Sequence, residues 1–311
     1  MIPAGTNVLV TGAGGSIGSE LCRKLAHTNL ILLEQSEYAL YCIAQEVNGA
    51  QVLGSCADDG LVRTVINNYR PAYVFHTAAY KHVPMLESAN AFAGVRNNVL
   101  GTLATLKATE GRYVLISTDK AVEPSCIMGA SKRLCELLVM EYGGTVVRFG
   151  NVLGSSGSVI PAFRRQIEAG GPVTVTHPEV ERYFLTIPQA VDLVLKASEL
   201  PPATYMLDMP KVKIMDLARE MIGGKDIKIE FTGLRPGEKL TESLSYPYER
   251  KAETPHAAIY SLTSKTPKVS HRLSWLNRDW ASFEETRDWL TSVLTQCSPA
   301  VSHGHLSVVK N

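Results

Sequence analysis

A glycine-rich turn near the start of the chain most constrains the fold. An apolar run at residues 7–11 precedes this turn, and a helical pattern with Leu21 and Leu25 on one face follows it. Glycines between a first strand and a first helix let the backbone approach a pyrophosphate, which the helix N-terminus then stabilises. The order of strand, turn and helix predicts a dinucleotide site. Its expected cofactor-binding residues are Gly12, Gly15, Ser16, Ile17 and Gly18.

Strand-like apolar runs and helical patterns then alternate along the chain, at intervals of about 20–30 residues. The pattern continues to residue 154 and predicts an α/β fold, a Rossmann doubly wound parallel sheet. Beyond residue 154 the alternation becomes irregular, which predicts a smaller, discontinuous C-terminal substrate domain. Basic residues there suit a diphosphate, although each alone is also consistent with a solvated surface charge. They are Arg165, Arg182, Arg235 and Lys239.

The composition excludes several function classes. The 311 residues have a formal net charge of +1, so no global charge favours nucleic acid or an anionic membrane. No apolar run approaches the roughly 18 residues of a membrane span, and the N-terminus lacks a signal pattern. The six cysteines have no metal-site spacing. We expect a cytoplasmic protein with no membrane span, no nucleic-acid partner and no metal.

The second apolar run ends at Glu34, where a dinucleotide site places its ribose-binding carboxylate. A carboxylate accepts hydrogen bonds from ribose hydroxyls and repels a 2′-phosphate, so Glu34 favours NAD. The neutral neighbours Gln35 and Ser36 leave NADP as the alternative. A different interpretation is that Glu34 only begins the next helix.

The fourth apolar run, residues 73–76, leads into small residues that permit close approach to a cofactor. We expect Ala78 and Ala79 to contact it, with Lys81 and His82 facing the cleft. In the helical pattern that follows, asparagines at 97 and 98 are costly on an apolar face unless their amides are bonded. They bond backbone near the site, or they lie on the outer face.

The segment 113–132 carries the residues best suited to chemistry. Its apolar start delivers Thr118, Asp119 and Lys120 to the carboxyl end of a strand, where open α/β sheets bind ligands. A carboxylate and an amine side by side are suited to proton transfer. The simpler alternative is a surface turn with an ion pair.

Seven segments together resemble the extended short-chain dehydrogenase/reductase superfamily. Within it, they are similar to the UDP-N-acetylglucosamine 4,6-dehydratases of bacterial polysaccharide biosynthesis. The resemblance covers about residues 6–245. In chain order the segments are TGAGGSIGSE, HTAAYKHVPMLE, NNVLGT, STDKAVEPSCIMGASK, RFGNVLGSSGSVIP, THPEVERYF and GLRPGEKLTE.

The resemblance implies a division of the chain and a set of site residues. It implies an NAD-binding Rossmann domain in residues 1–154 and 187–210 and a nucleotide-sugar-binding domain in residues 155–186 and 211–296. A flexible tail is expected in residues 297–311. The implied catalytic residues are Thr118, Asp119, Lys120, Met128 and Lys132. Further cofactor contacts are expected at Asp58 and Lys132. The implied substrate-binding residues are Lys81, His82, Asn151, Ser158, Val159, Arg182, Arg235 and Glu238.

The implied reaction oxidises C4 of the sugar, eliminates water across C5 and C6, and returns the hydride to C6. The product is UDP-2-acetamido-2,6-dideoxy-α-D-xylo-hexos-4-ulose. Asp119 and Lys120 match the acid and base of the elimination, which requires a lowered pKa if Lys120 is the base. Thr118 would bond the C4 oxygen, and Lys132 would hold the nicotinamide ribose.

The sequence departs from the superfamily at Met128, where a tyrosine is usual. A thioether cannot exchange a proton, so the usual tyrosine base is absent. A subgroup of the dehydratases carries the same methionine, and its members have an N-terminal membrane region. This chain is expected to be a soluble short form or an excised catalytic part. Residues 54–56 also lack an aspartate that relatives use for the adenine.

Three other functions compete with a C5-retaining dehydratase. They are a C5-inverting dehydratase, a UDP-sugar 4-epimerase and a non-catalytic dinucleotide-binding sensor. Met128 disfavours the first two, and the presence of Asp119 and Lys120 disfavours the sensor. The apolar patterns at residues 89–109 and 131–141 also predict a homodimer or higher homo-oligomer, because superfamily relatives pair through these helices.

Overall fold

The computed structural model describes residues 2–155 and 158–297, and its centre is a nine-stranded sheet. The strand order is β13-β14-β10-β6-β5-β4-β1-β2-β3. From β3 to β10 all neighbours pair in parallel, whereas β14 and β13 add an antiparallel edge. The strands are β1 (Asn7–Thr11), β2 (Asn29–Glu34), β3 (Gly49–Leu53), β4 (Tyr73–His76), β5 (Arg112–Thr118), β6 (Thr145–Phe149), β10 (Thr204–Leu207), β13 (Arg250–Glu253) and β14 (Ile259–Thr263).

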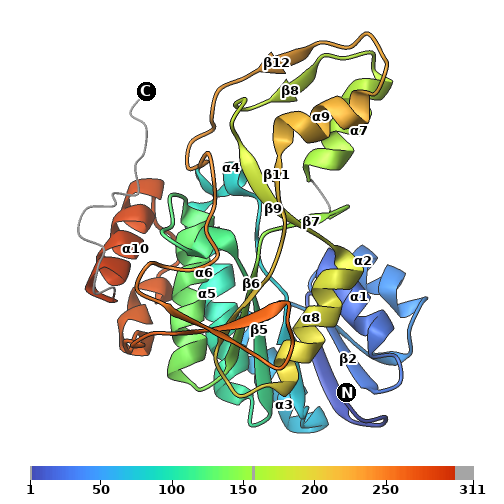
Figure 1. Cartoon of the computed structure of the whole chain (residues 1–311). Helices are drawn as coiled ribbons and strands as arrows, with labels where there is room; N and C mark the ends of the chain where they lie inside the picture. Colours follow the sequence, from blue (N-terminus) through green and yellow to red (C-terminus); the bar gives the residue numbers. More distant parts are fainter. Residues whose placement is uncertain (1, 156–157, 298–311) are drawn as a thin grey trace.

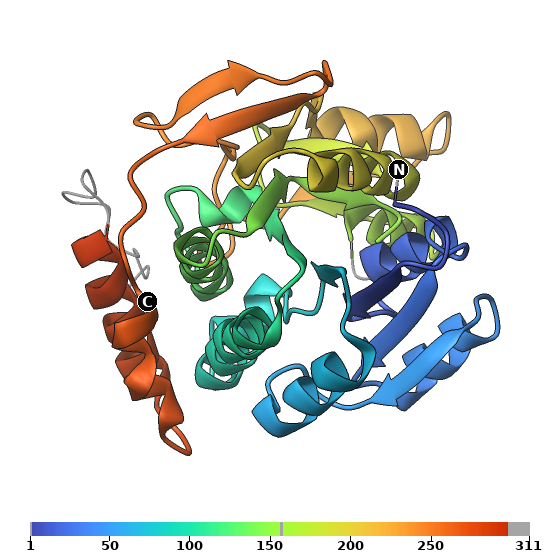
Figure 2. The same ribbon diagram turned by 90° about the horizontal axis from the view of Figure 1, so that it is seen from below.

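The predicted doubly wound parallel sheet is confirmed. Strands covered on both faces are apolar on both faces, and Val8, Leu9 and Val10 of β1 are fully buried. One face is covered by α3 (Asp59–Tyr69), α5 (Ala91–Ala108) and α6 (Ile127–Glu141). The other is covered by α1 (Ser16–Lys24), α2 (Glu37–Ala44) and α8 (Ile187–Glu199). The sheet therefore lies between two helical layers (Figure 2).

A smaller domain lies beyond the carboxyl ends of the parallel strands (Figure 1). It has its own apolar core, which includes Phe163, Val173, Phe184 and Ile214. Its elements are α7 (Val159–Glu168), β8 (Val173–Val175), β9 (Glu181–Thr186), α9 (Ile214–Ile222) and β12 (Ile229–Phe231). The short strands β7 (Asn151–Leu153) and β11 (Lys211–Lys213) pair with β9 and join the smaller domain to the sheet.

The C-terminal third differs from the predicted division at residues 211–296. The hairpin β13–β14 extends the large sheet beside β10. After it, η2 (Ser270–Asn277) and α10 (Phe283–Cys297) pack against α5 and α6, so they too belong to the large domain. Cys297 is the buried last residue of α10 and is not part of a tail. The rest of the predicted tail, residues 298–311, lies outside the described residues.

The packing of α10 removes the surface argument for a dimer. The apolar residues of α5 and α6 form one buried cluster with Leu273, Leu290 and Val293. Trp275 stacks on Trp289, with ring centroids 4.7 Å apart, and helps to close this cover. The apolar residues that were expected to meet a partner subunit are therefore covered within the chain. The sequence did not reveal this, because the packing of α10 against α5 and α6 is a long-range contact.

Across residues 2–155 and 158–297, no helix combines the length and the apolar character that crossing a bilayer requires.

Candidate active site

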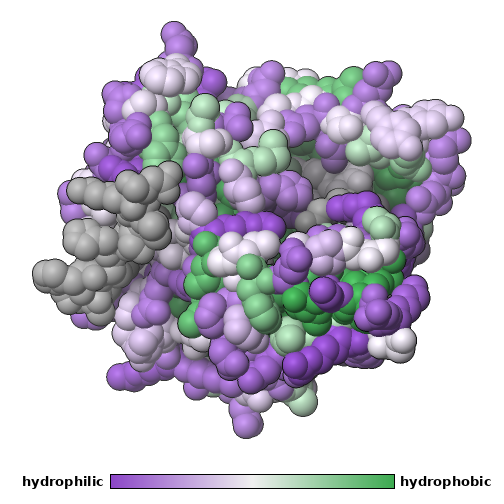
Figure 3. Space-filling view, turned by 90° about the horizontal axis from the view of Figure 1, so that it is seen from above, coloured by the Kyte–Doolittle hydropathy of each residue, from purple (hydrophilic) through white to green (hydrophobic). Residues whose placement is uncertain are grey.

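A cavity of about 570 Å³ lies where the carboxyl ends of β1, β2, β4, β5 and β6 face the smaller domain. Figure 3 views the molecule from the side of the smaller domain, where the surface is hollowed and hydrophilic and hydrophobic residues both reach the rim. Residues from both domains line the cavity. This is the position at which an open α/β sheet binds its ligands.

The glycine turn forms one wall of this cavity. Gly12 has φ +66°, and a Cβ there would lie 2.8 Å from Cα of Ala78. Gly15, Ser16 and Ile17 line the cavity as predicted. Gly18 does not line it: a Cβ at Gly18 would overlap the carbonyl oxygen of Gly12, so this glycine lets α1 pack against the turn. No side-chain hydrogen bond caps the N-terminus of α1, and a helix N-terminus favours an anion.

Glu34 lies at the end of β2 and lines the same wall. Its Oε2 accepts a hydrogen bond from the Gly14 N–H (3.1 Å), and its Oε1 accepts from the N–H groups of Gln35 (2.9 Å) and Ser36 (3.0 Å). The carboxylate therefore holds the glycine turn in place. Helix α2 starts only at Glu37, with Ser36 as its N-cap, so the interpretation of Glu34 as a helix start is wrong.

Asp58 is not part of the cavity wall. Its Oδ1 accepts a hydrogen bond from the Leu61 N–H (3.0 Å) and caps α3. Gly54 and Cys56 line the cavity instead. The acid next to the expected adenine position therefore has a structural partner, which the sequence pattern did not reveal.

The predicted reacting residues meet at the end of β5. Asp119 is fully buried, and its Oδ1 accepts hydrogen bonds from the Thr118 hydroxyl (2.9 Å) and the Lys120 ammonium (3.0 Å). Lys120 also donates to the Asn151 side-chain oxygen (3.3 Å). Thr118, Lys120 and Asn151 line the cavity, and Asp119 lies behind them. Its Oδ2 has no hydrogen-bond partner among the described residues.

The electrostatic surroundings of Lys120 bear on whether it is suited to the role of acid or of base. Burial lowers the pKa of Lys120, but the negative charges of Asp119 and Glu242 outweigh burial and raise this pKa above its ordinary value. The condition for Lys120 to act as the base, a lowered pKa, is therefore not met in this state, and the sequence did not show that Glu242 lies near this amine. In the ligand-free protein Lys120 is a charged ammonium, which is the acid form.

Helix α6 brings Met128 and Lys132 to the cavity. Both are buried, and burial lowers the pKa of Lys132. Helix α6 can start this close to Lys120 because residue 129 is glycine: a Cβ there would overlap the Lys120 carbonyl oxygen. Met128 therefore lies in the cavity wall, at the position where the resemblance implies a tyrosine.

The loop after β4 carries Ala78, Ala79, Lys81 and His82, which all line the cavity. Asn98 of α5 fixes this loop: its Oδ1 accepts from the Tyr80 N–H (2.8 Å), and its Nδ2 donates to the Tyr80 carbonyl (3.1 Å). The amide also donates to Ser131 of α6 (3.0 Å). Of the two alternatives for the asparagines, bonding near the site is correct for Asn98.

Lys81 and His82 lie at the exposed rim of the cavity. Partial burial of the ammonium, and then the charge of Lys120, lower the pKa of Lys81. Burial and the charge of Lys81 lower the pKa of His82. The positive charges of Lys81 and Lys120 therefore act on each other here, which suits an anionic ligand, whereas His82 is held toward its neutral form.

The smaller domain supplies Ser158, Val159 and Arg235 to the opposite wall. Arg182 and Glu238, also predicted as substrate-binding residues, do not line the cavity. They form an ion pair (3.0 Å) in which Arg182 is buried. This pair joins β9 to the loop that carries Arg235.

Two residues near the Asp119–Lys120 pair were not predicted from the sequence. Glu242 is buried, and its Oε2 lies 3.6 Å from the Lys239 ammonium. Gly150 lines the cavity, and a Cβ there would lie 3.0 Å from Oδ2 of Asp119. Both belong to segments that carried the resemblance, but only the fold places them beside Asp119.

Fold and cavity together define a dinucleotide-type α/β protein with a second domain across the binding edge. The model of the family described as "Polysaccharide biosynthesis protein" matches residues 8–264, and the chain belongs to this family.

Among curated relatives, the chain is 46% identical over 283 residues to the capsular polysaccharide biosynthesis protein CapD of Staphylococcus aureus. It is 45% identical over 279 residues to the probable polysaccharide biosynthesis protein EpsC of Bacillus subtilis. These matches cover 81% and 80% of this chain but 47% and 46% of the relatives, so the chain spans about half of their length. A UDP-glucose 4-epimerase of Rickettsia canadensis is 40% identical over 189 residues, 55% of each chain.

Among solved structures, Pen from Bacillus thuringiensis is similar with a TM-score of 0.79 and 30% identity. The match covers 94% of this chain and 99% of Pen. The dTDP-glucose 4,6-dehydratase DesIV of Streptomyces venezuelae, solved with NAD and TYD bound, has a TM-score of 0.67 and 21% identity. That match covers 77% of this chain and 88% of DesIV, and it shows a shared fold.

Proposed function

We propose that this chain is an NAD-dependent UDP-N-acetylglucosamine 4,6-dehydratase that retains the configuration at C5. One observation carries the proposal: Lys120 reaches the cavity wall with its ammonium 3.0 Å from the buried carboxylate of Asp119. A reaction that only moves a hydride does not need such a pair. Elimination of water needs an acid and a base at neighbouring carbon atoms.

The cavity fits a dinucleotide on its large-domain side. Cβ atoms at Gly12 and Gly18 would collide with backbone of the loop after β4 or of the turn, and α1 has no capping side chain. Gly12, Gly15, Ser16 and Ile17 would hold the pyrophosphate, and Glu34 would accept bonds from the adenosine ribose. Bound NAD would supply a hydride acceptor for C4 and a hydride donor for C6.

The pair of Asp119 and Lys120 would carry the protons of the elimination. Lys120, charged before the reaction, donates a proton to the C6 hydroxyl, which leaves as water. Asp119 accepts the proton from C5, for which its carboxylate turns toward the cavity past Gly150. A proton that passes back across the 3.0 Å from Asp119 to Lys120 then restores the pair. Over the whole reaction the C4 hydroxyl gives up one proton when C4 is oxidised, and C5 takes up one proton when the hydride returns to C6.

The other wall residues would orient the sugar nucleotide. Thr118 donates to Asp119 and keeps an acceptor lone pair for the C4 hydroxyl. Lys81, His82 and Arg235 would meet the diphosphate, because an anion lowers the cost of gathering positive charge. Met128 has no proton to deliver to the opposite face of the intermediate, which supports retention at C5.

The test is incubation with UDP-N-acetylglucosamine followed by proton NMR of the product. A C6 methyl doublet identifies a dehydratase, and the C5 coupling reports the configuration. Asp119→Asn and Lys120→Met should each abolish methyl formation and still hold cofactor. Lys213→Met, which changes an exposed lysine of the smaller domain, is the matched control and should keep wild-type turnover. Near-native turnover of either site variant would refute the assigned roles.

The cofactor is tested separately by denaturing the purified protein and identifying the released nucleotide by mass spectrometry. The position of Glu34 predicts NAD. Mainly NADP would contradict this argument.

A UDP-sugar 4-epimerase is the second candidate, favoured by the similarity to the Rickettsia canadensis protein of that name. An epimerase returns the hydride to C4 and leaves the C6 hydroxyl in place. The same NMR experiment separates the two, since an epimerised product has no C6 methyl group.

A further inference from the structure

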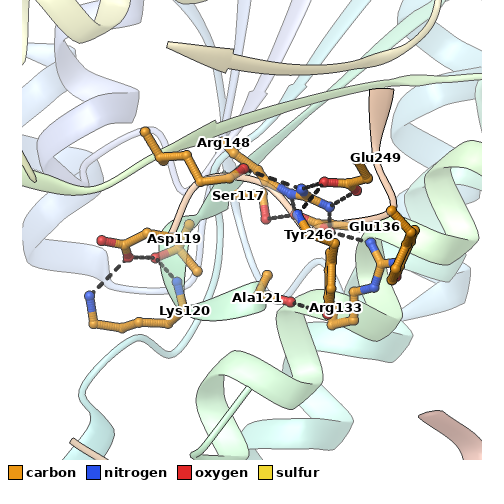
Figure 4. Close-up of polar contacts among 12 residues, drawn as sticks. Ser117, Asp119, Lys120, Ala121, Arg133, Glu136, Arg148, Tyr246 and Glu249 are labelled. Atoms are coloured by element: carbon orange, nitrogen blue, oxygen red, sulfur yellow. Dashed lines mark hydrogen bonds and ion pairs between the residues drawn. The ribbon is translucent and has the colours of Figure 1, made fainter. Parts of the chain in front are cut away.

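The catalytic turn (residues 117–122) is held at both ends by side chains from distant parts of the chain. Before the reacting residues, the Ser117 hydroxyl donates to Oε1 of Glu136 (2.6 Å). After them, the Ala121 carbonyl accepts from the Tyr246 hydroxyl (2.9 Å). Asp119 and Lys120 thus lie between two anchored residues (Figure 4), and Thr118 lies between the same two residues in the sequence.

The two anchors are joined through Arg148 of β6. Its Nε donates to Oε1 of Glu136 (2.7 Å), and its Nη1 donates to Oε2 of Glu249 (2.7 Å). That same Oε2 accepts from the Tyr246 N–H (2.8 Å). These hydrogen bonds form a path from Ser117 to Ala121, and the backbone of the catalytic turn closes it into a ring. The path passes through Glu136, Arg148, Glu249 and Tyr246. Figure 4 shows this ring beside the Asp119–Lys120 pair.

The segment that carries Tyr246 runs along the catalytic turn, and we call residues 237–246 the latch. Lys239 donates to the Val122 carbonyl (2.9 Å). At the start of the latch the Gly237 carbonyl accepts from the Ser125 hydroxyl (2.8 Å), and a Cβ at Gly237 would lie 2.7 Å from Cβ of Cys126. Close approach is possible only because residue 237 is glycine.

The chemistry of this hydrogen-bonded network indicates that it orients the catalytic turn rather than that it stabilises the fold. Arg148 and Glu136 are almost fully buried, and desolvation of a buried ion pair offsets most of its attraction. Apolar side chains would fill the same space at less cost. What charged and hydroxyl groups add is directional bonds to the two residues that flank the reacting ones.

We propose that the latch is a positioning element of the active site and that Tyr246 is its main positioning residue. The proposal rests on the proposed function of Asp119 and Lys120. The Tyr246 hydroxyl fixes the carbonyl directly after Lys120 and so sets the direction in which the ammonium reaches the sugar. Tyr246 itself does not line the cavity and acts through the turn.

The test compares Tyr246→Phe with Tyr248→Phe. The two rings stack with centroids 4.9 Å apart, and each loses one hydroxyl. The Tyr248 hydroxyl accepts from Arg133 (3.2 Å) and, among the described residues, has no hydrogen bond to the catalytic turn. Tyr246→Phe should lower kcat about fivefold, equal to about 1 kcal/mol for one hydrogen bond, with KM and bound nucleotide unchanged. Tyr248→Phe should stay within about twofold of wild type.

Hydrogen exchange measured by mass spectrometry gives a readout that does not depend on activity. Peptides that cover residues 117–126 should exchange faster in Tyr246→Phe than in wild type or Tyr248→Phe. Lys239→Met removes the donor to the Val122 carbonyl and should also lower kcat while KM stays unchanged. This second variant keeps the proposal testable if Tyr246→Phe does not fold.

Equal kcat losses in the two tyrosine variants, or no loss in Tyr246→Phe, would overturn the positioning role. A wild-type protein that forms no methyl product, combined with faster exchange only in Tyr246→Phe, would refute the proposed function and uphold the latch.

Discussion

His76, the last residue of β4, provides a quantitative prediction about stability and pH. The ring is buried beneath the cavity, its Nδ1 lies 2.8 Å from the Thr11 hydroxyl, and its Nε2 has no hydrogen-bond partner among the described residues. Burial, and then the charge of Lys132, lower the pKa of His76 from 6.5 to about 3. The folded protein therefore holds this imidazole in its neutral form.

The sign of the effect follows from the lowered pKa. Below pH 6.5 the unfolded chain binds a proton at His76, whereas the folded chain does so only near pH 3. The contribution to stability is complete above pH 6.5 and is lost as the pH falls toward 3. The whole shift corresponds to about 5 kcal/mol, of which about 2 kcal/mol is lost by pH 5.

The measurement is urea unfolding at pH 7.5 and pH 5.0 for wild type and His76→Asn. The variant cannot protonate, so wild type should lose about 2 kcal/mol more between the two pH values. His271→Asn is the control: this histidine is exposed, and the variant should lose as much as wild type.

A second buried group does not interfere in this pH window. Burial raises the pKa of Glu136, but Arg148 and Arg133 overcome it and hold this pKa at about 2. The contribution of Glu136 is present above pH 4.5 and is lost as the pH falls from there toward 2. Equal losses in wild type and His76→Asn would refute the argument that His76 is kept neutral.

Three other changes test separate parts of the structure. Met128→Tyr should restore a proton donor opposite the Asp119–Lys120 pair and give some C5-inverted product by NMR; a product that is only retained would show that residue 128 does not control the configuration. Gly18→Ala forces α1 away from the turn and should cost about 1–3 kcal/mol of unfolding free energy together with bound nucleotide, whereas Gly224→Ala, which meets no atom within 4 Å, should change neither. Removal of residues 283–311 uncovers the apolar face of α5 and α6 and should make the chain self-associate in light scattering, and a truncated chain that stays monomeric would contradict this reasoning.

Local patterns in the sequence were sufficient for the sheet and for much of the site. The strand, glycine turn and helix at the start of the chain form from neighbouring residues. Asp119 and Lys120 are adjacent in the sequence, so their pairing at a strand end could also be predicted. The apolar positions of helix α9 follow a regular helical period, so this helix too can be read from its local sequence.

Long-range packing decided what the sequence did not show. The pKa of Lys120 is raised first by Asp119 and then by Glu242, and Glu242 comes near this amine only through the fold of the latch. Asp58 caps a helix through the Leu61 N–H, and this role depends on where α3 begins in the fold. The cover that α10 places over α5 and α6 also joins segments from opposite ends of the chain.

The latch has a consequence for how this protein becomes active during synthesis. Thr118, Asp119 and Lys120 leave the ribosome together with the strands that build the dinucleotide side of the cavity. Tyr246 and Glu249, which complete their support, emerge much later. A nascent or proteolysed chain that ends before residue 237 would carry every reacting residue on an unsupported turn. Under the proposed function, such a fragment would bind nucleotide before it could dehydrate a sugar, so the order of translation would separate the two abilities in time.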